Sequence, residues 1–485
     1  MSDIPLHFQS ISELSQAIHG GALSPVELTR HFLARIEELD GALHAYLRVL
    51  PERALGAAEA AQTALRAGQD LGPLHGIPFA VKDLFDAKGV PTTAGSPLLH
   101  DNVAAADAAA TLRLARAGMV LLGKTHTVQF AYGGAGVNHH HGTPHNPWLA
   151  RHHVPGGSSS GSGVAVGAGL APVALGTDTG GSVRIPAGLN GVTGLKTTVG
   201  RISRAGVFPL SHSLDSVGPL CRSAEDAALL LQALQGPDER DASTRHVPPV
   251  DALRGLRDGV RGMHVAFAET ALWDDVEPDV AARVRDTGKV FESLGAKVGS
   301  VPFKVAAAAQ ELNRRGNVIA AEAYAVHEER ITRHGDQYDP IVAARILGGK
   351  DVTAADYIRN TQAWATLREE ALDALRNVEV LLCPTTVIPA KPLDEVDASL
   401  EAYVTPNLKY VRNTAVGNIL NLCALSVPCG FTAGGLPVGL MMYGKPFDEA
   451  TLLRAGYAFQ QATDWHRRWP DLSWVAKAQG RARDK

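Results

Sequence analysis

Cysteine is scarce in this sequence, with 4 residues among 485. Cys221, Cys383, Cys423 and Cys429 form no paired CxxC motifs, so neither a disulfide framework nor a structural zinc site is expected. A chain of this kind is typical of a reducing compartment. We therefore expect a cytoplasmic protein that needs no metal and no other cofactor.

Long runs of basic or apolar residues are also missing. Lys and Arg number 46 against 50 Asp and Glu, giving a formal net charge of -4, and the basic residues are scattered along the chain. This distribution does not indicate a nucleic-acid surface. No apolar run approaches the length of a membrane span, and Met1–Pro5 offers no basic region before an apolar core. We therefore predict neither membrane association nor a signal peptide.

The sequence contains no linker-like segment, low-complexity stretch or internal repeat. Its length alone would suggest about three domains. However, apolar runs of strand length are spread over most of the chain, at residues 77–81, 119–122, 172–176, 380–384, 425–428 and 439–442. Because the ends of this sheet are far apart in sequence, we predict one domain over residues 1–485.

Helical patterns precede and separate the predicted strands. Capping boxes at Ser10–Glu13 and Ser24–Glu27 each begin an N-terminal helix. Further helices are predicted over residues 52–67, 107–117 and 161–169, and a mostly helical stretch over residues 304–377 is interpreted as a cap over an active site. This alternation predicts an α/β fold in which a large mixed β-sheet is covered by helices on both faces.

The segment Thr177–Pro186 has the most informative local chemistry. Gly180 and Gly181 directly precede Ser182, so successive backbone N–H groups can converge without a Cβ in the way. Such a turn suits an oxyanion hole, and a helix opening at Ser182 would add positive potential there. Taken alone, the tripeptide Gly180-Gly181-Ser182 is also typical of an ordinary turn in which the serine is a helix N-cap.

Two other features stand at defined distances from Ser182. Ser158 lies 24 residues earlier in the serine-rich loop Gly156–Ser162, and Lys82 lies 76 residues before Ser158 at the end of an apolar run. Burial would lower the pKa of this lysine from about 10.4 toward the range of about 7–8 that suits a general base. A lysine that extends its amine to the surface is the alternative if Lys82 is considered alone.

Other serine and phosphate chemistries fit the sequence less well. Gly157–Gly161 matches the short pattern G-x-S-x-G, but no downstream histidine stands in a motif that favours a hydrolase triad. No serine stands three residues before Lys82, Lys124 or Lys196, so the Ser-x-x-Lys arrangement fails. The glycine-rich loop also lacks the P-loop lysine and the G-x-G-x-x-G spacing, which argues against nucleotide binding.

Taken together, these segments resemble the amidase signature family. The resemblance covers nearly the whole chain, and the segments that carry it are Leu74–Asp83, Gly123–Thr125, Asn146–Pro147, Pro155–Ser162, Leu175–Pro186, Gly191–Lys196, Cys383–Thr385 and Leu436–Leu440. It implies the amidase signature fold and a Ser-Ser-Lys triad.

The triad that the resemblance implies has Ser182 as nucleophile, Ser158 as bridging serine and Lys82 as general base. The N–H groups of Thr179, Gly180, Gly181 and Ser182 would then form the oxyanion hole. The resemblance further implies a cis peptide bond between Gly157 and Ser158.

The activity implied is hydrolysis of a C–N bond in a small or aryl amide, carbamate or urea-like substrate, through an acyl-enzyme on Ser182. The alternative is the glutaminase (A) subunit of a tRNA-dependent amidotransferase. The segment from Arg412 to Cys429 is more similar to free-standing amidases, and no clear clamp for a glutamine carboxylate is visible. A scaffold with a vestigial site is disfavoured because all three triad residues are present. A homodimer is compatible with this interpretation.

Residues around the site receive less specific predictions. Similarity to the family suggests that Ala131 and Tyr132 contact the substrate, with Phe208 as a weaker candidate, and core packing is the alternative for each. Gln129 stands where the family usually has an acidic residue. Asp178 and Arg184, which flank the nucleophile, are interpreted as a scaffold pair.

A histidine-rich loop is the clearest compositional oddity. Its histidines are His139, His140, His141, His145, His152 and His153. Three adjacent residues cannot easily all face one ion, so we do not expect a metal site there. The resemblance places this loop beside the substrate entrance.

Overall fold

The computed structural model describes residues 4–269, 271–314 and 317–475. Met1–Asp3, part of the segment considered for a signal peptide, lie outside these residues. Eleven strands form the central sheet, namely β1 (Tyr46–Val49), β2 (Pro78–Lys82), β3 (Val120–Thr125), β4 (Val173–Asp178), β5 (Thr193–Lys196), β6 (Ser216–Cys221), β7 (His264–Glu269), β8 (Lys297–Pro302), β9 (Val380–Pro384), β10 (Cys423–Phe431) and β11 (Pro437–Gly444).

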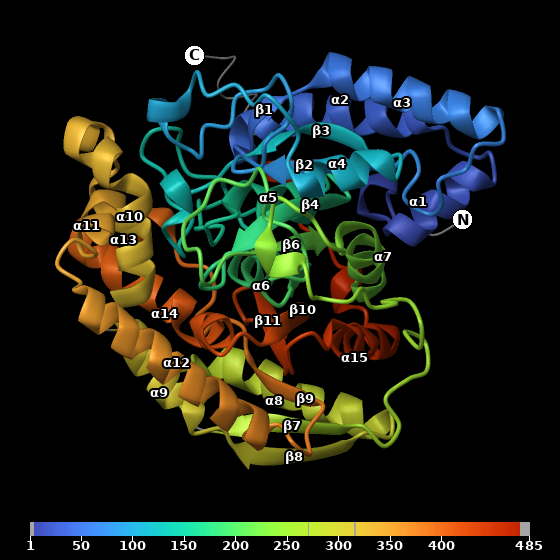
Figure 1. The fold of residues 1–485 in the computed structure, drawn as a ribbon. Coiled ribbons are helices and arrows are strands. Elements are labelled where there is room, and N and C mark those ends of the chain that lie inside the picture. The colour runs from blue at the N-terminus through green and yellow to red at the C-terminus, as the bar shows by residue number, and fades with distance from the viewer. Residues whose placement is uncertain (1–3, 270, 315–316, 476–485) are drawn as a thin grey trace.

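The α-helices among the described residues surround this sheet (Figure 1). They are α1 (Ile11–His19), α2 (Pro25–Leu43), α3 (Pro51–Arg66), α4 (Ala109–Arg116), α5 (Ser160–Gly167), α6 (Arg184–Asn190), α7 (Ala224–Leu234), α8 (Pro278–Ser293), α9 (Val305–Arg314), α10 (Asn317–His334), α11 (Pro340–Leu347), α12 (Ala354–Ala374), α13 (Leu393–Val396), α14 (Leu400–Ile419) and α15 (Glu449–Ala462).

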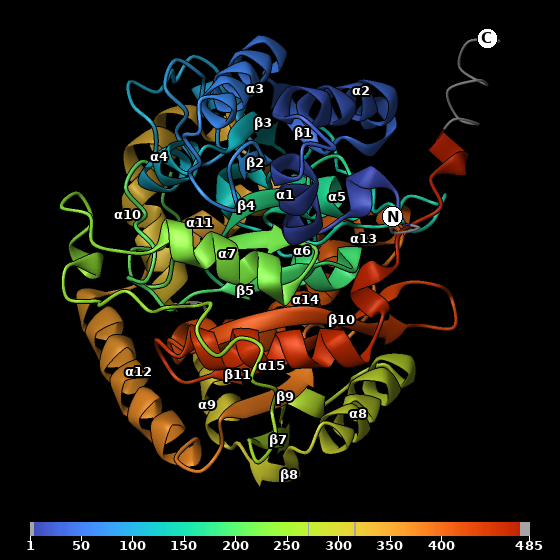
Figure 2. The same ribbon diagram turned by 90° about the vertical axis from the view of Figure 1, so that its right-hand side faces the viewer.

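The sheet is mixed, in the order β1-β3-β2-β4-β6-β5-β10-β11-β9-β7-β8. β2 pairs in parallel with β3 and β4, and β7 pairs in parallel with β8 and β9. In Figure 2, α7, α15 and α8 lie in front of the sheet, while α6 and α14 lie behind it. The predicted α/β fold, with a large mixed sheet covered on both faces, is confirmed.

Local signals in the sequence are reproduced at several elements. Ser10 and Ser24 form complete capping boxes at the starts of α1 and α2. β9 has the predicted bounds. Each end of β2, β3 and β4 lies within three residues of the end predicted from the sequence. β1, β5, β6, β7 and β8 were not identified from the sequence, because these strands are short or interrupted by Gly, Pro and polar residues, which weakens their apolar pattern.

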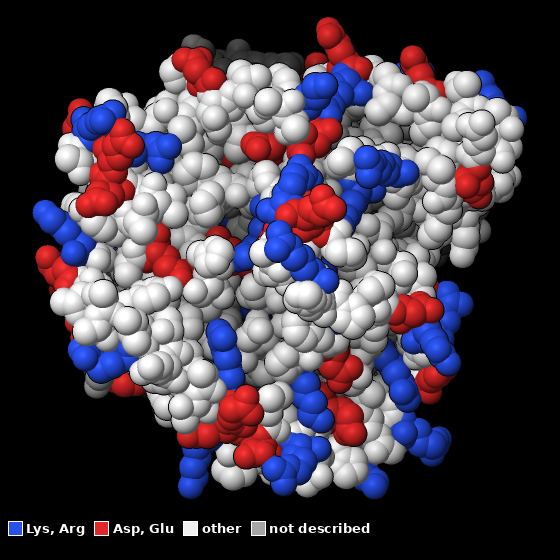
Figure 3. Space-filling view, in the orientation of Figure 1, with Lys and Arg blue, Asp and Glu red and all other residues white. Residues whose placement is uncertain are grey.

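The predicted helical region near residues 304–377 consists of α9, α10, α11 and α12, apart from residues 315 and 316, which lie outside the described part. These helices form one flank of the molecule, together with α14 (Figure 1). Across the face in Figure 3, acidic and basic side chains are interspersed. In the described residues no helix is both long and apolar enough to span a membrane.

Candidate active site

Lys82 ends β2, which is the central strand of the parallel group β3-β2-β4. Every residue of this strand is buried, and Lys82 itself has no exposed surface. Its Nζ lies 2.7 Å from Ser158 Oγ and 2.8 Å from Thr177 Oγ1. Burial lowers the pKa of Lys82 to about 7, although the charges of Asp215 and Asp178 act in the opposite direction. The lysine is therefore not a surface lysine, and its amine is largely neutral just above neutral pH.

Ser158 lies in the loop that leads into α5. The expected cis peptide bond between Gly157 and Ser158 is confirmed. A Cβ at Gly157 would lie 2.7 Å from the Gly133 carbonyl oxygen and 2.8 Å from the Gly136 nitrogen, so only glycine fits. The Ser158 side chain is fully buried against Lys82. The position of this hydroxyl is thus fixed by tight backbone packing on one side and by the lysine on the other.

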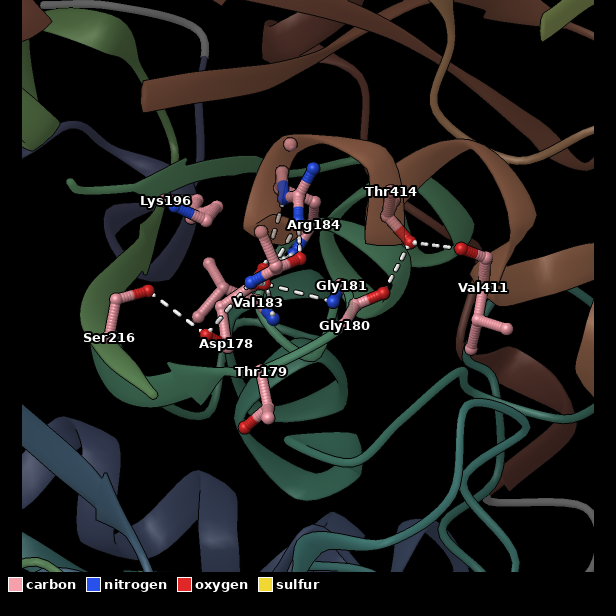
Figure 4. A network of polar contacts seen from close by, with 12 residues as sticks. Asp178, Thr179, Gly180, Gly181, Val183, Arg184, Lys196, Ser216, Val411 and Thr414 are labelled. Atoms are coloured by element: carbon pink, nitrogen blue, oxygen red, sulfur yellow. Dashed lines mark hydrogen bonds and ion pairs between the residues drawn. The ribbon is translucent and has the colours of Figure 1, made fainter. Parts of the chain in front are cut away.

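Ser182 follows β4 and comes directly after Gly180 and Gly181, which Figure 4 shows in the turn beyond Asp178. Gly181 has a φ of 130°, and a Cβ there would collide with the Thr414 side chain. Thr414 Oγ1 donates to the Gly180 carbonyl at 2.7 Å, which ties the turn to α14. The helix expected to open at Ser182 instead begins at Arg184, because Pro186 has no N–H to donate to the Ser182 carbonyl.

The turn that contains Ser182 lies next to Ser158. The Ser159 N–H donates to the Ser182 carbonyl at 3.3 Å. Within the described residues, no hydrogen bond joins the Ser158 and Ser182 hydroxyls, so the second step of a relay from Lys82 to Ser182 stays a prediction. Ser182 as a whole residue retains 8% exposure and lines a cavity.

Asp178 and Arg184 form a buried ion pair beneath the turn, as expected for a scaffold. Arg184 donates through Nη2 to Asp178 Oδ1 at 2.9 Å and through Nε to Oδ2 at 3.0 Å, and both side chains have no exposed surface. Asp178 also accepts from the Gly181 amide at 2.9 Å and from the Val183 amide at 3.1 Å. Burial acts to raise the pKa of Asp178, but the charges of Arg184 and Lys196 and the hydrogen bonds from Arg184 and Asn418 together outweigh it and hold this pKa below its ordinary value.

These contacts distinguish the four amides expected in the oxyanion hole. The Gly181 N–H points to Asp178 (Figure 4). In the part of the chain that the structure describes, the amides of Thr179, Gly180 and Ser182 donate to no protein acceptor. The latter three N–H groups are therefore the ones free to receive a negatively charged oxygen.

The cavity at Ser182 has a volume of about 50 Å³. Ala131 and Tyr132 line it, which brings both predicted contact residues to the side of the serine. Phe208 is not among its lining residues and stacks on Phe130, with ring centroids 5.6 Å apart. Arg345 also lines this cavity, and no sequence motif had indicated it as a site residue. The one feature of the sequence that could have indicated it is that it is a lone arginine in the otherwise apolar helix α11.

Gln129 and the histidine-rich loop hold neighbouring elements in place. Gln129 is buried, donates to Ser96 Oγ at 2.9 Å and accepts from the Asp339 amide at 2.7 Å. His139 lies 2.6 Å from Asp339 and 2.8 Å from Asp397. Hydrogen bonds to these two carboxylates raise the pKa of His139 to about 9. Over residues 4–269, 271–314 and 317–475, no group of three or more His, Cys, Asp or Glu is arranged to hold a metal ion.

Known proteins resemble this chain over almost its full length. The family model described as Amidase matches residues 27–453. The A subunit of the glutamyl-tRNA(Gln) amidotransferase of Chloroflexus aggregans is 38% identical, with 96% of this chain and 99% of that protein covered. The 2-amino-5-chloromuconic acid deaminase of Comamonas testosteroni is 39% identical, with 91% and 94% covered.

A solved structure gives the same result in three dimensions. The native peptide amidase of Stenotrophomonas maltophilia superposes with a TM-score of 0.84 at 31% identity, covering 97% of this chain and 100% of that one. Fold and sequence agree with the resemblance carried by the sequence motifs. The chain therefore belongs to the amidase family.

Proposed function

We propose that this protein hydrolyses the C–N bond of a small or aryl amide, carbamate or urea-like substrate through an acyl-enzyme on Ser182. The observation that carries the proposal is the fully buried Lys82, whose pKa is lowered to about 7 by burial and whose Nζ lies 2.7 Å from Ser158 Oγ. A base of this pKa can act near neutral pH. The family membership of the chain supports this class of reaction.

The first half of the proposed cycle acylates Ser182. Neutral Lys82 has two N–H groups and one lone pair, and Thr177 Oγ1, at 2.8 Å, is placed to accept one N–H. The lone pair can then accept the proton of Ser158 Oγ, which in turn takes the proton of Ser182 Oγ as this oxygen attacks the substrate carbonyl carbon.

The oxyanion is proposed to form among the amides of residues 179–182, with the N–H groups of Thr179, Gly180 and Ser182 as its main donors. In other hydrolases, removing one such donor costs about 2.7–4 kcal/mol of transition-state stabilisation. The buried pair of Asp178 and Arg184 supports this role, because it fixes the backbone of the turn before substrate binds.

The second half of the cycle releases both products. Ser158 returns a proton to the departing nitrogen, which leaves as an amine or ammonia. Water then attacks the acyl-enzyme with the same groups acting in reverse, so that Ser182 is regenerated. Each proton in this cycle is carried by Lys82, Ser158 or Ser182, so no step uses a histidine.

A second candidate is the glutaminase subunit of a tRNA-dependent amidotransferase. It is favoured by the 38% identity to the Chloroflexus aggregans protein, which covers 99% of that relative. In that case glutamine would be the substrate and ammonia would pass to a partner subunit. The similarity to the Comamonas testosteroni deaminase, which is named for an acidic substrate, favours a stand-alone enzyme equally well.

The two candidates are separated by a substrate panel. Purified protein is incubated with anilides, aliphatic amides, carbamates, ureas and glutamine, and released amine or ammonia is measured. We expect turnover of at least one non-glutamine class without added proteins, and no turnover by Ser182→Ala protein with an unchanged circular dichroism spectrum. Activity on glutamine alone, and only with partner subunits present, would overturn the proposal in favour of the second candidate.

A further inference from the structure

We propose that Asp215 is a positioning residue of this active site, which holds Thr179 in place in the turn before Ser182 and keeps a negative charge near Lys82. This inference rests on the proposed function, since it concerns the oxyanion amides and the general base of the same cycle. Asp215 is not among the residues that line the cavity at Ser182, so it would act through Thr179 and Lys82 rather than on the substrate.

The hydrogen bonds of the Asp215 carboxylate are the first argument. Asp215 directly precedes β6 and is buried. Its Oδ1 accepts from Thr179 Oγ1 at 2.5 Å, and its Oδ2 accepts from the amides of Leu210 at 2.9 Å and Ser211 at 3.0 Å. Both oxygens thus act as acceptors, which is the pattern of an ionised carboxylate. Burial raises the pKa of Asp215, and these hydrogen bonds oppose the rise.

The second argument is the place of Thr179 in the oxyanion turn. Thr179 is the first of the four residues expected to offer amides, and within the described residues its N–H donates to no protein acceptor. In Figure 4 its side chain points away from the ion pair of Asp178 and Arg184. Its hydroxyl is held by Asp215 instead. Because a donor is most effective when it is oriented before the negative charge develops, this bond contributes to the oxyanion site.

The third argument concerns charge. Two other carboxylates near Lys82 are already neutralised by basic side chains. Asp178 on β4 pairs with Arg184 at 2.9 Å. Asp83, which follows Lys82 in the chain, lies 2.8 Å from the Nζ of Lys124 on β3. Neither carboxylate is therefore free to serve as the counter-charge of Lys82.

Asp215 has no such ion pair in the part of the chain that the structure describes. The charge of Arg204 acts on it, but the Arg204 Nε lies 3.3 Å from Asp241. The negative charge of Asp215 acts on Lys82 and opposes the lowering of the Lys82 pKa by burial. In the proposed cycle Lys82 becomes positive when it accepts the proton of Ser158. An unneutralised carboxylate nearby stabilises that charge.

The loop that carries Asp215 is also fixed from outside. Glu322 on α10 accepts from the Ser213 amide at 3.1 Å and from the Tyr357 hydroxyl of α12 at 2.7 Å, and the Ser211 hydroxyl donates to it as well. The helical flank therefore holds the loop on one side while Asp215 joins it to the oxyanion turn on the other. This arrangement sets the position of Asp215 before substrate binds.

Asp215→Asn tests the charge. Asparagine keeps the size of the side chain and an oxygen for the amides of Leu210 and Ser211, but it removes the negative charge. The protonated form of Lys82 then becomes less favourable. With an amide that the wild type hydrolyses, the midpoint of the pH profile of kcat/KM should move to lower pH by about 0.5–1 pH unit. A substitution that only weakened the fold would lower the rate without moving the midpoint in this direction.

Thr179→Val tests the link to the oxyanion turn, because it removes the hydroxyl and keeps the charge of Asp215. We expect kcat to fall about 10- to 100-fold with an unchanged pH midpoint. Thr179→Ser, which restores the hydroxyl, should recover most of this loss. The matched control for charge removal is Asp286→Asn, since Asp286 on α8 forms an exposed pair with Lys289. This control should change neither kcat nor the pH midpoint.

The outcomes separate this inference from the proposed function. A pH midpoint that stays or rises in Asp215→Asn, or equal kcat in Thr179→Val and Thr179→Ser, would overturn the inference while amide hydrolysis stands. If Asp215→Asn does not fold, the comparison of the two Thr179 variants decides.

If the wild-type protein hydrolyses no amide, the proposed function fails and urea unfolding decides the inference. The rise of the free energy of unfolding with pH that comes from Lys82 should begin at lower pH in Asp215→Asn than in the wild type. The same onset in both proteins rejects the inference.

Discussion

Replacing the buried lysine gives the sharpest test of the proposed base. Burial lowers the pKa of Lys82 from 10.5 to about 7 in the native protein, while in the unfolded chain this side chain keeps its ordinary pKa. Between these two values the unfolded state binds a proton that the native state does not, so the free energy of unfolding rises with pH. Below pH 7 both states are protonated and the native state bears the full cost of a buried charge.

The size of this effect follows from the difference between the two pKa values. A shift of about 3.5 pH units corresponds to about 5 kcal/mol, and the slope approaches about 1.4 kcal/mol per pH unit within the window. Lys82→Met removes the titrating group but also leaves the Ser158 and Thr177 hydroxyls without their nitrogen partner. That loss, about 1–3 kcal/mol per hydroxyl, does not depend on pH. The difference in free energy of unfolding between wild type and Lys82→Met should therefore depend on pH only through the titration of Lys82.

The assay is equilibrium urea unfolding of wild type and Lys82→Met between pH 6 and 9.5, after reversibility has been verified. We expect the stability of wild type relative to the variant to increase by about 2 kcal/mol between pH 7 and 9. In parallel, kcat/KM of the wild type should rise about tenfold per pH unit below pH 7 and level off above it, and Lys82→Met should be inactive. A stability difference that is flat across this pH range would refute the argument that Lys82 is neutral in the native site.

Two further predictions concern the scaffold of the nucleophile turn. Asp178→Asn leaves the Arg184 charge buried without its counter-ion, so the free energy of unfolding measured in urea titrations should fall by about 3–5 kcal/mol. The control Asp394→Asn, which removes one partner of an exposed ion pair, should change the free energy of unfolding by less than about 1 kcal/mol. Equal effects of the two substitutions would contradict the scaffold role of Asp178. In Gly181→Ala the alanine must adopt a φ of 130° and its Cβ meets the Thr414 side chain, so the urea midpoint of unfolding should fall clearly. In the control Gly180→Ala the Cβ meets nothing within 4 Å, so the midpoint should not fall. A tolerated Gly181→Ala would show that the turn is not strained.

Much of the fold was predictable because its signals are local. In a capping box the serine hydroxyl accepts a hydrogen bond from the backbone N–H three residues later. This pattern is local, so Ser10 and Ser24 mark the starts of α1 and α2 without information on tertiary contacts. Strands that are buried on both faces, such as β2 and β9, need apolar side chains at successive positions, so they stand out in the sequence as continuous apolar runs. The edge strand β8 is mostly exposed, and its mixed residues carry no comparable pattern.

The candidate site was predictable to the level of residue types. A glycine pair before Ser182, a serine-rich loop and a lysine that ends an apolar run are all visible in the sequence, and the family resemblance relates them. Arg345 and the contacts of Gln129 were not predictable. They arise because α11 begins beside Gln129 and extends to the cavity at Ser182, and no local pattern in the sequence states which helix lines which cavity.

The sequence by itself determined which groups are available for chemistry, namely an amine, two hydroxyls and a turn that can expose backbone amides. Only the tertiary structure decided their state. Lys82 and Ser158 are 76 residues apart in the chain, and they meet because β2 lies between β3 and β4 while the loop before α5 packs onto the end of β2. The pKa of the amine falls because that packing removes water from it, and burial is a property of the whole fold rather than of any segment.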